Sequence, residues 1–175
     1  GIGGMQLFVA EVPGVTKDKL HPRIKETAKR LWGLYILLTV VQTARLMAGG
    51  MNLHESLCHA YATTATGGFS TRNGGMMEFS PYIQYVTVVF MFLAGTNFTL
   101  YYYALKGNWR EFFNDSEMRC YLLIFGGAVL LIGLNLWLTG TCDSPGRALR
   151  FSFFQSASIM TTTGFATTDF DQWTA

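Results

Sequence analysis

The sequence has 175 residues, of which 50% are hydrophobic and only 14% are charged. An ordinary soluble domain has about 25% charged residues, so this composition indicates a protein that lies in a lipid bilayer. The net charge of +2 at pH 7 favours neither nucleic acid nor an acidic partner, and we expect no binding to nucleic acid.

Basic residues are concentrated in two segments, 13–30 and 106–119, which we predict to be cytoplasmic linkers under the positive-inside rule. They hold nine of the thirteen basic residues: Lys17, Lys19, Arg23, Lys25, Lys29, Arg30, Lys106, Arg110 and Arg119. Residues 1–12 read as the end of a spanning helix that starts elsewhere. The sequence lacks an initial Met and stops just after a loop motif, so we expect both ends to be cuts and the remainder of the same chain to complete the protein.

The first full unit covers residues 31–105. Its predicted parts are a spanning helix at 31–48, a short pore helix at 52–64, a filter loop at 65–71 and a second spanning helix at 81–105. Asn52, with Glu55 three residues later, has the pattern of a capping box and marks the start of the short helix. Because that helix is too short and too polar to cross a bilayer, it is predicted to be re-entrant.

The second unit, at 120–175, follows the same order but is incomplete. Its predicted parts are a spanning helix at 120–138, a pore helix at 145–161 and a filter loop at 162–167. Ser144 and Pro145 supply a cap and a proline at the first helical position, where the missing N–H costs nothing. The sequence thus predicts an all-α membrane protein built from repeats of helix, re-entrant pore loop and helix, as in potassium channels.

The two loops carry the same motif. Thr66-Gly67-Gly68-Phe69-Ser70-Thr71 aligns with Thr162-Thr163-Gly164-Phe165-Ala166-Thr167, 165 − 69 = 96 positions later. Irregular backbone at membrane depth is tolerated only where protein buries it or where it lines a watery cavity. Two such segments therefore indicate a function rather than two ordinary tight turns.

Thr/Gly backbone of this kind can coordinate a dehydrated potassium ion through its carbonyl oxygens. Gly68 and Gly164 can adopt positive φ and allow close approach to the ion, and Thr66, Gly67, Thr162 and Thr163 are predicted to add adjoining carbonyls. We expect support from two pairs of side chains: Phe69 and Phe165 as wedges against the pore helices, and Thr71 and Thr167 as hydroxyl ties at the outer ends. The negative ends of both pore helices also favour a cation.

These residues resemble the superfamily of Trk, Ktr and HKT potassium transporters, and most closely the TrkH type. The segments at 64–71 and 161–165 are similar to its second and third filters, and 93–100 is similar to the helix that follows the second filter. The resemblance implies four repeats around a pseudo-fourfold pore, selectivity for K⁺ as the transported ion, and no organic cofactor. It also implies a homodimer with cytoplasmic nucleotide-binding regulatory subunits in the bacterial inner membrane. A gating segment and the fourth filter would follow residue 175.

Other interpretations remain possible at this point. His54, Cys58 and His59 have helical spacing that could hold a metal, but a closed site usually needs four ligands. Cys58, Cys120 and Cys142 are predicted to be packing residues. A membrane scaffold without conduction is a second hypothesis, and an intramembrane hydrolase is a third that lacks any Gly-x-Ser-x-Gly or His-Glu-x-x-His motif. The sequence leaves open whether transport is passive or coupled to H⁺ or Na⁺, and how it is gated.

Overall fold

The structure of the protein, a computed structural model, describes residues 24–97, 100, 101, 107 and 114–168. The predicted end of a preceding helix at 1–12 and most of both linkers lie outside these residues. Every regular element in the described part is helical, which confirms the all-α class. In chain order the elements are α2 (Ile24–Ala48), α3 (Leu53–Thr64), the 3₁₀ helix η1 (Gly75–Glu78), α4 (Pro81–Ala94), α7 (Ser116–Leu138) and α8 (Pro145–Met160).

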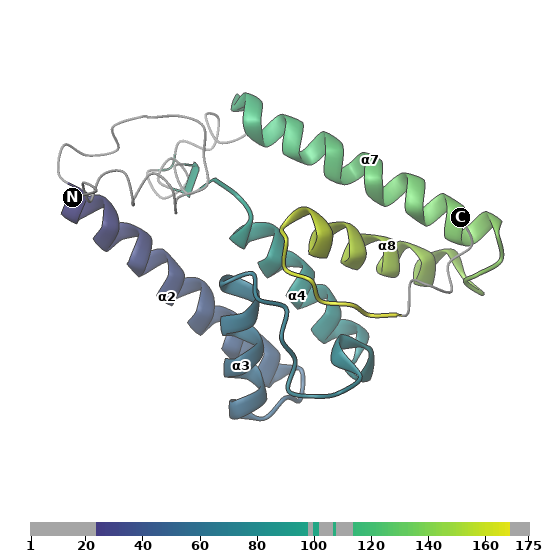
Figure 1. Cartoon of the computed structure of the whole chain (residues 1–175), viewed down its shortest axis with the longest axis horizontal. Coiled ribbons are helices and arrows are strands. Elements are labelled where there is room, and N and C mark those ends of the chain that lie inside the picture. Colours follow the sequence, from purple (N-terminus) through teal and green to yellow (C-terminus); the bar gives the residue numbers. More distant parts are fainter. Residues whose placement is uncertain (1–23, 98–99, 102–106, 108–113, 169–175) are drawn as a thin grey trace, which may run out of the picture.

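The helices form two units that meet at α4. In the first unit α2 packs against α3, and α4 contacts both. In the second unit α7 packs along α8, and α8 contacts α4 across the boundary between the units. Figure 1 shows α4 in the middle, with α2 and α3 on one side and α7 and α8 on the other.

One apolar core joins the two units. Its buried members come from α2, η1, α4, α8 and the connecting loops: Leu46, Met51, Met76, Phe79, Ile83, Val88, Met91, Phe154, Ala157 and Phe165. Met76, Met91 and Phe154 are fully buried. Because side chains from both units fill this cluster, the relative position of the two units is fixed by packing.

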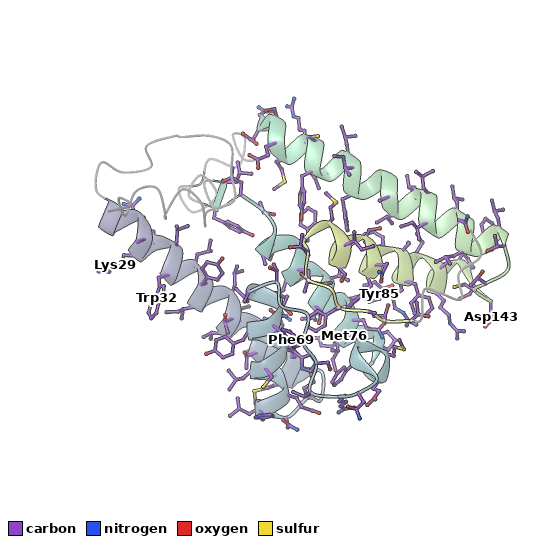
Figure 2. The ribbon with its side chains drawn as sticks, viewed as in Figure 1. Lys29, Trp32, Phe69, Met76, Tyr85 and Asp143 are labelled. Carbon is purple, nitrogen blue, oxygen red and sulfur yellow. The ribbon has the colours of Figure 1, made fainter. Side chains whose placement is uncertain are left out.

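Two helices present apolar side chains outward. The segment Ala28–Ala48 of α2 and all of α7 are long and apolar enough to cross a membrane. On α7, Leu123, Leu131 and Leu138 are each more than 70% exposed. Figure 2 shows Trp32, which is 72% exposed, near the start of α2. A contiguous apolar surface of this kind is stable against acyl chains, so these faces are expected to contact lipid.

Helix α2 starts earlier than predicted. The sequence interpretation placed residues 24–30 in a linker and began the helix at 31, but α2 begins at Ile24 and includes Lys29 and Arg30. Lys and Arg are good helix formers, and long basic side chains at a helix end can reach the polar interface. The basic residues therefore lie in the first turns of the helix and do not interrupt it.

Helix α7 also starts earlier, at Ser116 rather than at 120. The side chain of Asp115 caps it by accepting hydrogen bonds from the N–H groups of Glu117 and Met118. The prediction had assigned these residues to the second linker because of their charge. A capped, charged first turn is favoured at a helix N-terminus, so the helix extends to include it.

The predicted long helix at 81–105 is interrupted. Helix α4 ends at Ala94, and Gly95 forms its C-cap with its N–H donating to the carbonyl of Met91. A Cβ added to Gly95 would lie 2.7 Å from Cγ2 of Thr161 and 2.9 Å from the hydroxyl of Tyr121. The helix breaks where these two side chains of the second unit take up the space beside the backbone.

The two short helices have the caps that the sequence indicates. The Asn52 side chain accepts from the Glu55 N–H at 2.8 Å before α3, and the Ser144 hydroxyl accepts from the Arg147 N–H at 3.4 Å before α8. Helix α3 has 12 residues and α8 has 16, so neither is long enough to cross the hydrocarbon region. After each one the chain reverses direction.

Candidate functional site

The backbone N–H groups of the two loops fold back onto the preceding helices in one repeated pattern. In the first loop the N–H groups of Thr66, Gly67 and Gly68 donate to the carbonyls of Thr63 and Ala62. The distances are 3.1 Å for Thr66, 2.7 Å for Gly67 and 3.4 Å for Gly68. The second loop repeats this 96 positions later: Thr162 donates to Ile159 at 3.0 Å, and Thr163 and Gly164 donate to Ser158 at 2.9 and 3.4 Å.

The backbone dihedrals repeat as well. Thr66 and Thr162 have φ of 51° and 57°, and Gly68 and Gly164 have φ of 66° and 86°. Glycine adopts this left-handed region freely, but for a β-branched residue it is strained. The same strained threonine in both loops indicates a backbone shape that is required by function.

The carbonyl groups of these loops differ from the N–H groups in their hydrogen bonding. Within the described residues, none of the six carbonyl oxygens of 66–68 and 162–164 accepts a hydrogen bond. Free carbonyls are costly in a dry environment, and coordination of a cation is one way to satisfy them. The arrangement therefore uses the N–H groups for structure and leaves the oxygens for a ligand.

The two loops touch one another. A Cβ on Gly68 would lie 2.1 Å from the carbonyl oxygen of Thr163, so no larger residue fits between them. Figure 1 shows the loop after α8 running beside the loop after α3. Gly164 has no such neighbour within 4 Å in the part of the chain that the structure describes. The carbonyl oxygen of Thr163 and the backbone of Gly68 thus lie close enough to belong to one site.

The electrostatic setting of the loops favours a positive charge. Both α3 and α8 end directly before a loop, so each directs the negative end of its dipole toward the loop.

The aromatic residues of the two motifs lie in different environments. Phe165 is 2% exposed and stacks on the ring of His59, with centroids 6.0 Å apart. Phe69 is 80% exposed and does not wedge against α3 within the described residues, so its supporting role stays a prediction. Phe165 packs on the preceding unit, and by the same geometry Phe69 would need a unit before α2, which the described residues do not contain.

The predicted hydroxyl ties at the outer ends of the loops are not formed within the described residues. Thr71 is exposed, and the hydroxyl of Thr167 is buried without a partner there. Two serines contribute the hydrogen bonds that hold the loops instead. The Ser158 hydroxyl donates to the carbonyl of Phe165 at 2.6 Å, and Ser70 contacts His59 at 3.0 Å. In each case a side chain of the pore helix binds the returning loop.

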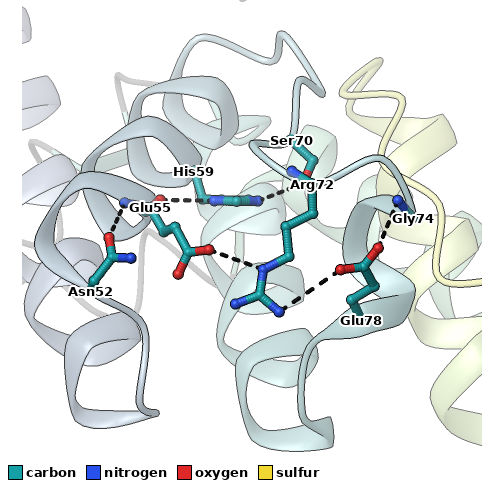
Figure 3. Close-up of polar contacts among 7 residues, drawn as sticks. All are labelled: Asn52, Glu55, His59, Ser70, Arg72, Gly74 and Glu78. Carbon is teal, nitrogen blue, oxygen red and sulfur yellow. Dashed lines mark hydrogen bonds and ion pairs between the residues drawn. The ribbon is translucent and has the colours of Figure 1, made fainter.

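A polar network lies behind the first loop (Figure 3). The Arg72 guanidinium pairs with the Glu55 carboxylate at 2.9 Å and lies 3.9 Å from that of Glu78. Glu78 accepts from the N–H of Gly74 at 2.9 Å. The hydrogen bond from Arg72 lowers the pKa of Glu55 below its ordinary value, so the carboxylate stays charged at neutral pH. This network fixes the returning chain against the first turn of α3.

Sequence reasoning missed the roles of His59 and Ser70, which the fold brings together although they are eleven residues apart. The signal was available, because a loop that returns along its own pore helix places such residues side by side. The chain passes Ser70 opposite His59 and then Arg72 opposite Glu55. This order shows that the segment after α3 runs antiparallel to the helix, as a re-entrant hairpin must.

The possible metal site is not formed. The Cys58 sulfur lies 3.8 Å from Nε2 of His54, whereas His59 faces Ser70. No group of three His, Cys, Asp or Glu in the described residues could hold a metal ion. All three cysteines are free, and only Cys142 is buried; Cys120 is exposed on α7, so its prediction as a packing residue is wrong.

Comparison with known proteins identifies similar sequences over nearly the whole chain. A family model described as TrkH, cation transport protein, matches residues 1–175. The Trk system potassium uptake protein TrkH of Halomonas elongata is 39% identical over 99% of this chain and 36% of its own length. The protein of the same description from Escherichia coli K12 is 38% identical with the same coverage.

A solved structure agrees with the fold. The crystal structure of the potassium transporter TrkH from Vibrio parahaemolyticus superposes with a TM-score of 0.85 at 36% sequence identity, covering 96% of this chain and 37% of that chain. The chain therefore spans slightly more than a third of the length of the relatives it matches.

Proposed function

The chain belongs to the TrkH family of cation transport proteins, and on that premise we propose that it supplies two of the filter loops through which a potassium uptake protein conducts K⁺. The relatives are named as potassium uptake proteins, and this chain corresponds to about a third of each. The proposed filter residues are Thr66, Gly67, Gly68, Thr162, Thr163 and Gly164.

The observation that carries the proposal is the repeated backbone of the two loops. Each loop uses its N–H groups to cap a pore helix and leaves three consecutive carbonyls without a hydrogen bond in the described residues. A K⁺ ion sheds its water only if several oxygens replace the hydration shell at once. Two adjacent loops with free carbonyls, together with helix dipoles of the right sign, supply part of such a cage.

The test is replacement of Gly68 by alanine in the full-length protein, reconstituted into liposomes and assayed for K⁺ or Rb⁺ uptake. Gly68→Ala puts a methyl group 2.1 Å from the Thr163 carbonyl oxygen, so the loops must separate and the flux is expected to fall at least tenfold. Gly140→Ala is the matched control. Gly140 also has positive φ (70°) but has no neighbour within 4 Å, and its flux is expected to stay near the wild-type value.

Equal uptake by wild-type and Gly68→Ala protein would contradict the proposed function. A comparable loss in both Gly68→Ala and Gly140→Ala would show that backbone strain, and not the filter, causes the effect.

The proposal includes the setting of the protein. The subunit is a multi-pass protein of the bacterial inner membrane, with its basic linkers in the cytoplasm. The rest of the same chain completes the pore, and a homodimer with cytoplasmic nucleotide-binding regulatory subunits is the proposed assembly. K⁺ is the transported ion and no organic cofactor takes part.

A hydrolase is disfavoured, although Ser70 and His59 lie 3.0 Å apart as a nucleophile and base would. The His59 ring is fully buried between Phe79 and Phe165, and the Ser70 hydroxyl accepts the N–H of Arg72. A substrate cannot reach a base that aromatic rings enclose. We therefore expect a serine-reactive fluorophosphonate to leave Ser70 unlabelled. A scaffold without conduction would show no ion flux in the liposome assay.

A further inference from the structure

Four residues behind the 65–71 filter loop close a ring of hydrogen bonds that begins and ends at Glu55 (Figure 3). The His59 ring contacts the Glu55 carbonyl through Nδ1 at 2.8 Å and the Ser70 hydroxyl through Nε2 at 3.0 Å. The Arg72 N–H donates to the Ser70 oxygen at 3.2 Å, and Nε of Arg72 donates to the Glu55 carboxylate at 2.9 Å. This hydrogen-bonded ring joins the returning chain to the pore helix at two positions, His59 and Glu55.

The partners fix the direction of each hydrogen bond. A carbonyl oxygen can only accept, so Nδ1 of His59 carries the proton. In the neutral imidazole Nε2 is then an acceptor, and the Ser70 hydroxyl donates to it. The Ser70 oxygen keeps a lone pair for the N–H of Arg72. Every group in the ring is satisfied in one arrangement, so the ring defines one position for Ser70.

His59 also connects the two filters. Its ring is fully buried, with the edge of Phe79 at a centroid distance of 5.0 Å on one side and Phe165 stacked at 6.0 Å on the other. Phe165 belongs to the 162–167 filter loop and follows Gly164 directly. A shift of the imidazole would therefore move the surroundings of both loops.

The second unit has no counterpart of this ring. At the positions 96 residues later, His59 is replaced by Gln155 and Ser70 by Ala166. The side-chain oxygen of Gln155 is buried without a hydrogen-bond partner in the described residues. The second loop is held instead by Ser158, whose hydroxyl donates to the Phe165 carbonyl. Of the two loops that the structure describes, the ring therefore belongs to the 65–71 loop, and it is not a general requirement of the hairpin.

We propose that His59 is a positioning residue for ion selectivity: through Ser70 it holds the outer end of the 65–71 loop where its carbonyls fit K⁺ better than the smaller Na⁺. The Glu55–Arg72 pair closes the ring and holds the loop from its far side. A binding site keeps its preference only if supporting groups hold it within about 0.5 Å. A loop released from His59 can contract around Na⁺, and the preference is reduced.

The inference rests on the proposed conduction of K⁺, and its test compares Rb⁺ and Na⁺ uptake by full-length protein in liposomes. Ser70→Ala removes the hydroxyl alone, and the second loop already tolerates alanine at the equivalent Ala166. We expect its Rb⁺/Na⁺ uptake ratio to fall about fivefold, the ratio that one hydrogen bond of about 1 kcal/mol supports. Ser70→Thr keeps a hydroxyl and is expected to restore the ratio.

Ser56→Ala is the control, because it removes a hydroxyl from a residue of α3 that is buried and that has no hydrogen-bond partner in the described residues. This variant should keep the wild-type ratio. If Ser70→Ala kept the wild-type Rb⁺/Na⁺ uptake ratio, the positioning role would be overturned. A loss of flux in Gly68→Ala would in that case still support the pore. Absence of Rb⁺ uptake by the wild-type protein would instead overturn the pore and the positioning role together.

Discussion

At the scale of single residues, the clearest indication of function is the strained backbone of two threonines. Thr66 and Thr162 are the two residues other than glycine that have positive φ in the described part of the chain, and they occupy equivalent positions. Left-handed backbone costs an L-residue about 1 to 2 kcal/mol. The surrounding hydrogen bonds from loop to helix impose that cost twice. These hydrogen bonds give each loop a shape in which the neighbouring carbonyls accept no hydrogen bond from the described residues.

The Glu55–Arg72 pair leads to a prediction about pH. Its hydrogen bond lowers the pKa of Glu55 in the folded protein, so the pair stabilises the fold fully above the ordinary glutamate pKa of about 4.3. That contribution is lost as the pH falls through the lower, folded-state pKa. In detergent, wild-type protein should therefore have a higher Tm than Glu55→Gln at pH 7, and the difference should vanish under strongly acidic conditions.

The control for this prediction is the same comparison in an Arg72→Gln background, where Glu55 has lost its partner. The difference in Tm is expected to depend much less on pH there. The assignment would be contradicted if the Tm difference between wild-type protein and Glu55→Gln, both of which keep Arg72, stayed constant from neutral to acidic pH.

Residue-level prediction from sequence succeeded where a local rule applied and failed where partners come from afar. The Asn52 and Ser144 caps follow from residue type and spacing, and the structure has both. Phe69 and Phe165 occupy the same position in the repeated motif, yet one is exposed and the other buried, because burial depends on a neighbouring unit. No local pattern encodes that difference.

At the scale of elements, the break after α4 is the main departure from the predicted helices. An uninterrupted apolar run from 82 to 105 predicts one helix, and a single Gly inside it is a weak signal. The reason for the break lies in the other unit, where Thr161 at the end of α8 and Tyr121 of α7 fill the space beside Gly95. The shape of α4 is thus set by tertiary packing.

The packing at Gly95 can be tested by substitution. Gly95→Ala adds a methyl group 2.7 Å from Cγ2 of Thr161, and overpacking of this kind costs about 1 to 3 kcal/mol. We expect a lower Tm for the reconstituted protein. Thr161→Ser removes that Cγ2 while keeping the hydroxyl, so the double variant should recover part of the loss. A Gly95→Ala variant as stable as the wild type would contradict the close packing.

At the scale of the whole molecule, the repeat determines the architecture. The 96-residue offset predicted from sequence two pore helices and two loops, and the structure has the same hydrogen bonds and dihedrals at both. What sequence could not provide is the contact between them, with Gly68 against the Thr163 carbonyl and Phe165 against His59. These contacts depend on how units pack around a common centre, and a repeat alone does not specify its axis.

The central claim is that free carbonyls of residues 66–68 and 162–164 coordinate the transported cation. The most direct measurement is a crystal structure of the full-length protein with Tl⁺ in place of K⁺, analysed by anomalous difference density. We predict density on the axis between the two loops, within coordination distance of both Gly68 and Thr163. Well-ordered loops with no anomalous density there, or with their carbonyls facing lipid, would contradict it.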